Sequence, residues 1–261
     1  MPLRHNAARN LAMKAAMAAL LCGAVSMPAP LAAQAQEKPL KKKAKNVIIF
    51  IGDGMGISTI TAARIYDGQS KGMSGAENQL SFEKFPNVAL VKTYNTNQQI
   101  PDSAGTASAF STGVKTRAGM MGVGPATHLG DCAEGLANPV PNILEVAKAR
   151  GKKVGVVSTA RITHATPGSV YAHTPHRDWE NDGAIPEAER GKGCVDIARQ
   201  LTNSNFDLAM GGGRDHFFGK DKAKGGKRLS PDASLPADWA ARTGGSYVTS
   251  KAEMDAAKGS K

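Results

Sequence analysis

The sequence has few aromatic residues and lacks the motifs of the common nucleotide-binding folds. Aromatic residues make up 5% of the 261 positions, so we expect no base-stacking surface and no nucleic-acid partner, although the formal net charge is +11. No glycine–lysine pair is followed by serine or threonine, which excludes a P-loop. The glycines at positions 52, 54 and 56 are followed by Ile57, so the dinucleotide-binding fingerprint is incomplete. The basic surface is expected to be solvated and to attract anionic substrates.

Apolar runs long enough to cross a membrane are also missing. The run from Ala15 to Val25 is too short for a spanning helix. Its flanks have the features of an export signal, namely Arg4, Arg9 and Lys14 before it and Ala33-Gln34-Ala35 after it. We therefore predict a signal peptide over residues 1–35, a charged linker over 36–45, no stable membrane span, and export to a periplasmic or extracellular location.

Cysteine is scarce, with three residues in the whole chain. Cys22 lies within the predicted signal peptide, so cleavage leaves Cys132 and Cys194. Two cysteines in an oxidising compartment favour a disulfide, which would stabilise the fold by about 4 kcal/mol on a chain-entropy estimate. A zinc site on these cysteines is disfavoured because the sequence has no C-x-x-C pair.

Short apolar runs alternate with helical patterns along the rest of the chain. Strands are predicted over residues 46–51, 88–94, 153–159 and 206–210, with a further short strand over 247–249. Helices are predicted over residues 58–66, 104–114, 142–150 and 197–201, and a capping box of Ser250 and Glu253 begins a last helix. Residues 220–239 are predicted to be a polar loop. This alternation predicts an α/β fold with a mostly parallel central sheet flanked by helices.

Two acidic residues stand where such folds place functional groups. Asp53 follows the first predicted strand and lies between glycines, so it is either a turn residue or a ligand for a hard cation. Asp102 and Ser103 follow Pro101 at the start of a helix of small residues. Taken alone they favour a plain helix cap, and the alternative is a phosphate site with Ser103 as nucleophile.

A second group of polar residues follows the third predicted strand. His164 and Thr166 are two positions apart, so in extended backbone they project the same way and could complete an oxygen-rich metal site. Arg177 could clamp phosphate oxygens. Its alternatives are an ion pair with Asp178 and stacking on Trp179.

Taken together, these motifs resemble the alkaline phosphatase family. The resemblance covers the chain from about Lys45 to its end and is carried by six segments and a cysteine pair. These are residues 47–56, 101–107, 164–167 with 171–173, 177–179 and 210–214, and Cys132 with Cys194. It implies the family's three-layer α/β sandwich and hydrolysis of phosphate monoesters.

The resemblance also implies a role for each candidate residue. Ser103 would be the nucleophile that forms a phosphoserine, Asp102 would orient Arg177, and Arg177 would hold two phosphate oxygens. Asp53 would bridge a zinc and a magnesium ion, and His164 and Thr166 would ligate the magnesium. Zinc and magnesium would be the cofactors, and a homodimer is the assembly implied.

The chain departs from the family pattern after His216, beyond which it has no histidine. The family takes its remaining zinc ligands from a C-terminal half, so we expect a C-terminally incomplete fold. The alternative function is a truncated, non-catalytic exported fragment that binds phosphate or a metal. A sulfatase or phosphodiesterase relative is a third reading, against which the serine nucleophile argues.

Overall fold

The computed structural model describes residues 44–257. The predicted signal peptide and nearly all of the charged linker lie outside the described residues. The chain divides into two compact units, residues 1–50 and 51–261. The helices, strands and site described below all belong to the second unit.

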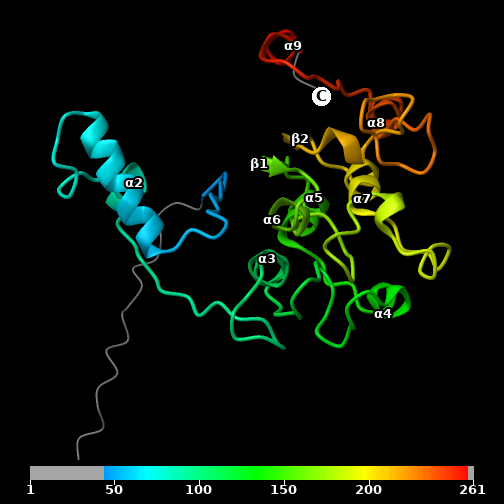
Figure 1. Cartoon of the computed structure of the whole chain (residues 1–261), viewed down its shortest axis with the longest axis horizontal. Helices are drawn as coiled ribbons and strands as arrows, with labels where there is room; N and C mark the ends of the chain where they lie inside the picture. The colour runs from blue at the N-terminus through cyan, green and yellow to red at the C-terminus, as the bar shows by residue number, and fades with distance from the viewer. Residues whose placement is uncertain (1–43, 258–261) are drawn as a thin grey trace, which may run out of the picture. The chain divides into compact units, whose positions relative to one another are not determined.

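The second unit alternates short helices with two strands (Figure 1). The α-helices are α2 (Ile57–Ser70), α3 (Ser103–Thr112), α4 (Cys132–Ala137), α5 (Ile143–Ala149), α6 (Ala165–Gly168), α7 (Ile197–Asn203), α8 (Leu235–Thr243) and α9 (Lys251–Ala256). The 3-10 turns are η1 (Ser81–Lys84), η2 (Asp182–Ala184) and η3 (Arg214–His216). The strands are β1 (Gly155–Arg161) and β2 (Leu208–Gly212).

Strands β1 and β2 run parallel and side by side, with Val156 opposite Ala209 (Figure 1). They confirm the third and fourth predicted strands. Asp207, the residue before β2, links the N-terminal ends of the two strands. Its carboxylate accepts hydrogen bonds from the amide of Val154, the residue before β1, at 2.9 Å and from Lys148 at 2.7 Å. Helices α6 and α7 lie in the connection between the strands, as a parallel crossover requires.

Three other predicted strands are not formed. Residues 46–51, 88–94 and 247–249 have no strand structure, and Phe50 and Leu90 are 89% and 94% exposed. A β-rich composition favours a strand only when a neighbouring strand accepts and donates the backbone hydrogen bonds. Within residues 44–257, the paired strands are β1 and β2 alone, so these runs have no such neighbour.

The helices follow the capping signals in the sequence. Asp102 caps α3 and Ser250 caps α9, as predicted. Asn142, which the sequence placed inside the helix over 142–150, is instead its N-cap, with both bonds of a capping box. Helix α8 contradicts part of the predicted loop over 220–239. It begins at Leu235, which is fully buried, and its C-cap is Gly244 in the left-handed conformation.

The main hydrophobic core joins the helices to the base of the strands. Its buried members include Ala104, Met121, Ile162, Tyr171, Ile197, Leu201, Phe206 and Leu235. Helix α3 contacts α5 and α6, and α6 contacts β1, so the core holds the start of α3 near the end of β1. No helix among the described residues is both long and apolar enough to cross a bilayer.

We expect Asp207→Asn to lower the free energy of unfolding by about 1–2 kcal/mol at neutral pH, because one carboxylate holds two lysines and a strand amide. These contacts lower the pKa of Asp207 to about 2 against the penalty of burial. The stability that Asp207 contributes is therefore fully present at pH values above its pKa in the unfolded chain, near 4, and is lost as the pH falls through its folded pKa of about 2. Denaturant melts from pH 7 to pH 2 should show the two proteins converging, and a constant gap would contradict this.

Candidate active site

The Asp102 carboxylate is the centre of the polar site at the start of α3. Each of its oxygens accepts two hydrogen bonds. Oδ1 accepts from the Gly105 amide and Asn95 Nδ2, both at 3.0 Å, and Oδ2 accepts from the Gly119 amide at 2.9 Å and Arg177 Nη1 at 3.2 Å. Ser103, the first residue of α3, is thereby held at a helix start where backbone N–H groups favour an anion.

The charge of Asp102 is stabilised by these donors. Burial raises the pKa of the carboxyl group, but the hydrogen bonds from the four donors outweigh it and lower the pKa below its ordinary value. Asp102 is therefore an anion at neutral and alkaline pH, and it can hold the Arg177 guanidinium by charge as well as by hydrogen bonding.

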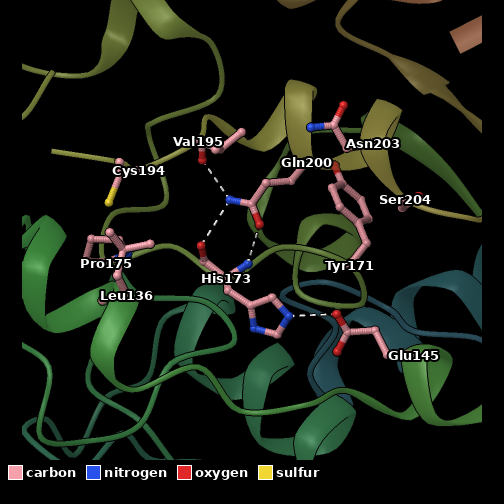
Figure 2. Close-up of a pocket in the computed structure, with 12 residues that line it drawn as sticks. Leu136, Glu145, Tyr171, His173, Pro175, Cys194, Val195, Gln200, Asn203 and Ser204 are labelled. Atoms are coloured by element: carbon pink, nitrogen blue, oxygen red, sulfur yellow. Dashed lines mark hydrogen bonds and ion pairs between the residues drawn. The ribbon is translucent and has the colours of Figure 1, made fainter. Parts of the chain in front are cut away.

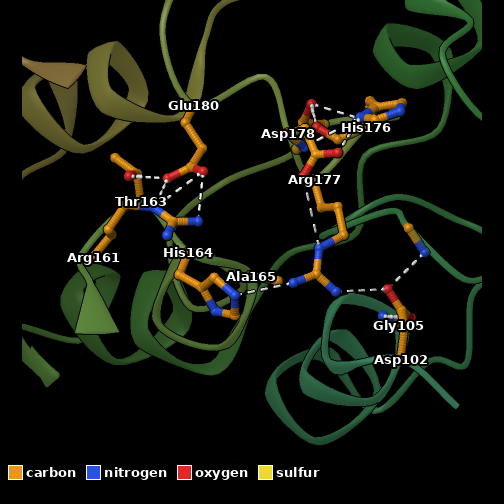
Figure 3. Close-up of polar contacts among 12 residues, drawn as sticks. Asp102, Gly105, Arg161, Thr163, His164, Ala165, His176, Arg177, Asp178 and Glu180 are labelled. Carbon is orange, nitrogen blue, oxygen red and sulfur yellow. Dashed lines mark hydrogen bonds and ion pairs between the residues drawn. The ribbon is translucent and has the colours of Figure 1, made fainter. Parts of the chain in front are cut away.

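Arg177 joins the two predicted groups of site residues (Figure 3). Its Nη1 donates to Asp102 and its Nη2 donates to His164 Nε2 at 3.1 Å, while its backbone amide donates to the Gly119 carbonyl at 2.7 Å. The nearest Asp178 oxygen is 4.0 Å from Arg177 Nε. The ring that stacks on Trp179 is that of His176, with centroids 6.0 Å apart.

Asp53, His164 and Thr166 also come together, although 111 to 113 positions of sequence separate Asp53 from the other two. Thr166 Oγ1 donates to Asp53 Oδ2 at 2.8 Å, and His164 Nδ1 lies 3.9 Å from the same oxygen. His164 is the N-cap of α6, three residues beyond the end of β1. The candidate ligands thus lie beyond the carboxyl end of a parallel strand.

Asp53 and Thr166 offer two oxygen donors, which suit a small hard cation such as magnesium. His164 Nε2 accepts from Arg177, so the ring proton of the imidazole lies on Nδ1. This buried nitrogen, which has no hydrogen-bond partner, therefore faces the Asp53 carboxylate as an N–H group and is not a metal ligand in this arrangement. In contrast, residues 44–257 contain no cluster of three or more His, Cys, Asp or Glu side chains able to hold a metal, so the described residues do not fit a complete zinc site.

The predicted cysteine pair forms a disulfide, with Cα atoms 5.7 Å apart. It packs in a small second core with Trp179 and Ile185. Trp179 of this small core follows Arg177 by two residues. The packing around the disulfide therefore stabilises the segment that carries the arginine.

A pocket separate from the Asp102 cluster lies beside the disulfide (Figure 2). It has a volume of about 330 Å³, and Glu145, His173 and Gln200 are among its lining residues. His173 Nδ1 lies 2.7 Å from the Gly122 carbonyl and Nε2 lies 2.8 Å from Glu145. Burial lowers the pKa of His173, but an acceptor at each ring nitrogen outweighs it and raises the pKa above the ordinary value.

Sequence reasoning missed the residues that support the site. Asn95, which is 3% exposed, lies in a segment predicted to follow a strand. Gly119 lies in a glycine-rich stretch, and Glu180 resembles an ordinary surface acid in the sequence. The two-residue spacing of Arg161 and Thr163, which is the same as that of His164 and Thr166, could have indicated that these two side chains share a partner.

The fold and site define a class of α/β protein in which polar residues converge beyond a parallel strand and at a helix start. Within that class, the chain belongs to the alkaline phosphatase family, because the family model described as alkaline phosphatase matches residues 44–261. The predicted family and α/β fold class are both confirmed.

Relatives of known identity support this assignment. The chain is 51% identical over 181 residues to the human tissue-nonspecific isozyme of alkaline phosphatase, covering 69% of this chain and 34% of that protein. It is 49% identical over 183 residues to alkaline phosphatase of Gadus morhua, covering 69% and 38%. The chain thus spans about a third of the length of these curated relatives.

Solved structures give the same result. Alkaline phosphatase from the Antarctic bacterium TAB5 aligns with a TM-score of 0.54 and 26% identity, over 79% of this chain and 49% of that one. A cold-active alkaline phosphatase from Shewanella sp. aligns with a TM-score of 0.56 and 27% identity, over 79% and 42%. A histidine-to-aspartate variant of the TAB5 enzyme has Mg bound.

Gly105→Ala should destabilise the protein by about 1–3 kcal/mol, because the new methyl group would overlap the Asn95 amide and lie 3.0 Å from the Arg117 carbonyl. Gly124→Ala is the matched control, since its Cβ would have no neighbour closer than 3.7 Å. Thermal melts of both variants test this. Equal melting temperatures would contradict the close packing around Asp102.

His173→Gln should lower the free energy of unfolding by about 1–2 kcal/mol at pH 6, because it removes a charged bridge between α5 and the Gly122 carbonyl. The histidine's contribution is complete below its unfolded pKa near 6.5 and is lost as the pH rises through the raised folded pKa. The difference in unfolding free energy between the wild type and His173→Gln should therefore become smaller at pH 9. His128→Gln, at an exposed ring, should change the unfolding free energy little at either pH. A difference for His173→Gln that stays the same at pH 9 would contradict the stabilising role of the charged His173 ring.

Proposed function

We propose that this site binds phosphate monoesters and transfers their phosphoryl group to Ser103 as a step in their hydrolysis. The observation that carries the proposal is the Asp102 carboxylate, which caps the helix that begins with Ser103 and holds Arg177 at 3.2 Å. One residue thus brings a serine hydroxyl, a helix N-terminus and a guanidinium to the same place. The family membership supports the same activity.

The chemistry follows from these groups. Ser103 Oγ gives up its proton and forms a bond to phosphorus while the bond from phosphorus to the ester oxygen breaks, and the leaving oxygen takes up that proton to give the alcohol. Water then attacks the same phosphorus, the bond from phosphorus to Ser103 Oγ breaks, Oγ takes up a proton from the water, and inorganic phosphate is released. Arg177 and the helix N-terminus stabilise the negative charge of the phosphoryl oxygens in both steps.

Magnesium is the metal that the described residues support as part of this proposal. Asp53 and Thr166 would supply oxygen ligands, and His164 Nδ1–H would face the Asp53 carboxylate beside the ion. His164 would become a ligand itself only if Arg177 released its Nε2. A bound divalent ion would add positive charge beside the phosphate. Zinc binding stays a prediction from the family resemblance.

We also propose export, in keeping with the signal features of residues 1–35. The Cys132–Cys194 disulfide supports this, because such bonds persist in oxidising compartments. The proposed substrates are small phosphate monoesters, and the homodimer implied by the resemblance stays a prediction.

A second candidate function is binding of phosphate or a divalent ion without turnover. It is favoured by the absence, within residues 44–257, of any group of three or more His, Cys, Asp or Glu side chains that could hold a metal ion. In this case Arg177 and the start of α3 would still bind phosphate.

The two functions are separated by p-nitrophenyl phosphate hydrolysis at alkaline pH with magnesium and zinc supplied. We expect Ser103→Ala to abolish turnover, since the variant cannot form the phosphoserine. Ser81→Ala, at an exposed serine in η1, should keep the wild-type rate. Equal rates in the wild type and Ser103→Ala would contradict the enzyme function, and phosphate binding that remains in both would support the second function.

A further inference from the structure

Beside the candidate site, one buried carboxylate gathers residues from three segments (Figure 3). Glu180 Oε1 and Oε2 accept from Arg161, with the shortest contact to each at 2.9 Å. Oε2 also accepts from Thr163 Oγ1 at 2.5 Å and lies 3.4 Å from His216 Nε2. Glu180 is 7% exposed, Thr163 is fully buried and His216 is 5% exposed.

Two of these partners control the segment that carries the candidate magnesium ligands. Arg161 is the last residue of β1, and Thr163 immediately precedes His164. The His164 amide donates to the Arg161 carbonyl at 2.9 Å, so the turn closes directly onto the residue that Glu180 binds. A carboxylate that holds both side chains fixes the direction in which the turn leaves β1.

The backbone of Glu180 is anchored independently. Its carbonyl accepts from the Ala198 amide at 3.2 Å, and the carbonyl of Trp179 accepts from the Ile197 amide at 2.9 Å. Both donors belong to the first turn of α7. Glu180 also follows Arg177 by three residues, so the same anchored segment carries the arginine that contacts His164.

The orientation of His216 is set by Asn181. Asn181 Oδ1 accepts from the Ala184 amide at 3.1 Å, so its Nδ2 is the atom that faces His216 Nδ1 at 2.9 Å. The His216 nitrogen nearest this donor is therefore an acceptor, and the ring proton lies on Nε2, toward Glu180. Glu180 thus meets positive or donor groups from Arg161, Thr163 and His216.

From this arrangement we propose that Glu180 is a positioning residue for the magnesium ligands. It holds the 161–166 segment so that His164 and Thr166 face Asp53. It does not itself contact Asp53, His164 or Thr166 in the hydrogen bonds of residues 44–257. The link to magnesium rests on the proposed function, whereas the positioning of the segment does not.

The test compares Glu180→Gln with Asp207→Asn by calorimetric titration of each folded chain with magnesium chloride. Both variants turn a multiply bonded carboxylate into an amide, but Asp207 lies where the strands begin and makes its contacts there. Loss of an outer-shell group bonded directly to a metal ligand weakens binding by about 10- to 100-fold, and Glu180 acts one step further out, through Arg161 and Thr163. We therefore expect a loss at the lower end of this range, about tenfold, for Glu180→Gln and a change of less than about twofold for Asp207→Asn.

A milder variant covers the case in which Glu180→Gln does not fold. Thr163→Val removes one hydrogen bond to Glu180 Oε2 and should weaken magnesium binding in the same direction by a smaller factor. Wild-type magnesium affinity in both variants, or in Thr163→Val where Glu180→Gln is unfolded, would overturn the proposal.

Hydrogen–deuterium exchange without metal separates this proposal from the proposed function. Faster exchange confined to residues 161–166 and 214–216 in Glu180→Gln, absent in Asp207→Asn, supports the positioning role. Unchanged exchange there overturns it. A wild-type chain that binds no magnesium contradicts the magnesium site of the proposed function, and the exchange result still decides the role of Glu180.

Discussion

The pairing of Asp102 with Arg177 is the interaction on which the arrangement of the site depends. A carboxylate partly withdrawn from water must have its charge satisfied, and Asp102 achieves this with two backbone amides, an amide side chain and a guanidinium. The result ties the start of α3 to the loop at Gly119 and to the segment of Arg177. Because the helix cap and the arginine partner are the same residue, Ser103 and Arg177 cannot be placed independently.

The same principle recurs around this centre. Glu180 links the end of β1 to the start of α7, and Glu145 links α5 to His173. Each acid fastens a loop to a helix or strand through partners that are distant in sequence. The segments that carry the candidate ligands contain little regular secondary structure. Their positions therefore depend on these polar contacts rather than on a large sheet.

Local capping rules predicted the start of α3 better than strand composition predicted the sheet. They placed Asp102 and Ser103 at a helix start, because a cap acts over a few positions. The two-residue spacing of His164 and Thr166 assumed extended backbone, whereas Thr166 lies in α6, and both residues still lie beside Asp53. The disulfide followed from compartment and count. The α/β fold class followed from the alternation of apolar runs and helical patterns, and the family followed from the resemblance of the motifs to alkaline phosphatases.

Features that depend on distant partners were not accessible in this way. The runs at 46–51 and 88–94 have strand composition, but a strand exists only when another strand pairs with it. The roles of Asn95 and Glu180 were hidden for a related reason. No residue close to Asn95 in the sequence indicates that it will contact Asp102, and none close to Glu180 indicates that it will contact Arg161.

The most direct measurement is acid-quenched mass spectrometry of the chain after incubation with a phosphate monoester, magnesium and zinc. If Ser103 is the nucleophile and Arg177 holds the phosphoryl oxygens, one phosphoryl group is expected on the peptide that contains Ser103, and it should be lost when Arg177 is replaced by alanine. Phosphorylation at another residue, or none at Ser103 while substrate is consumed, would contradict both roles.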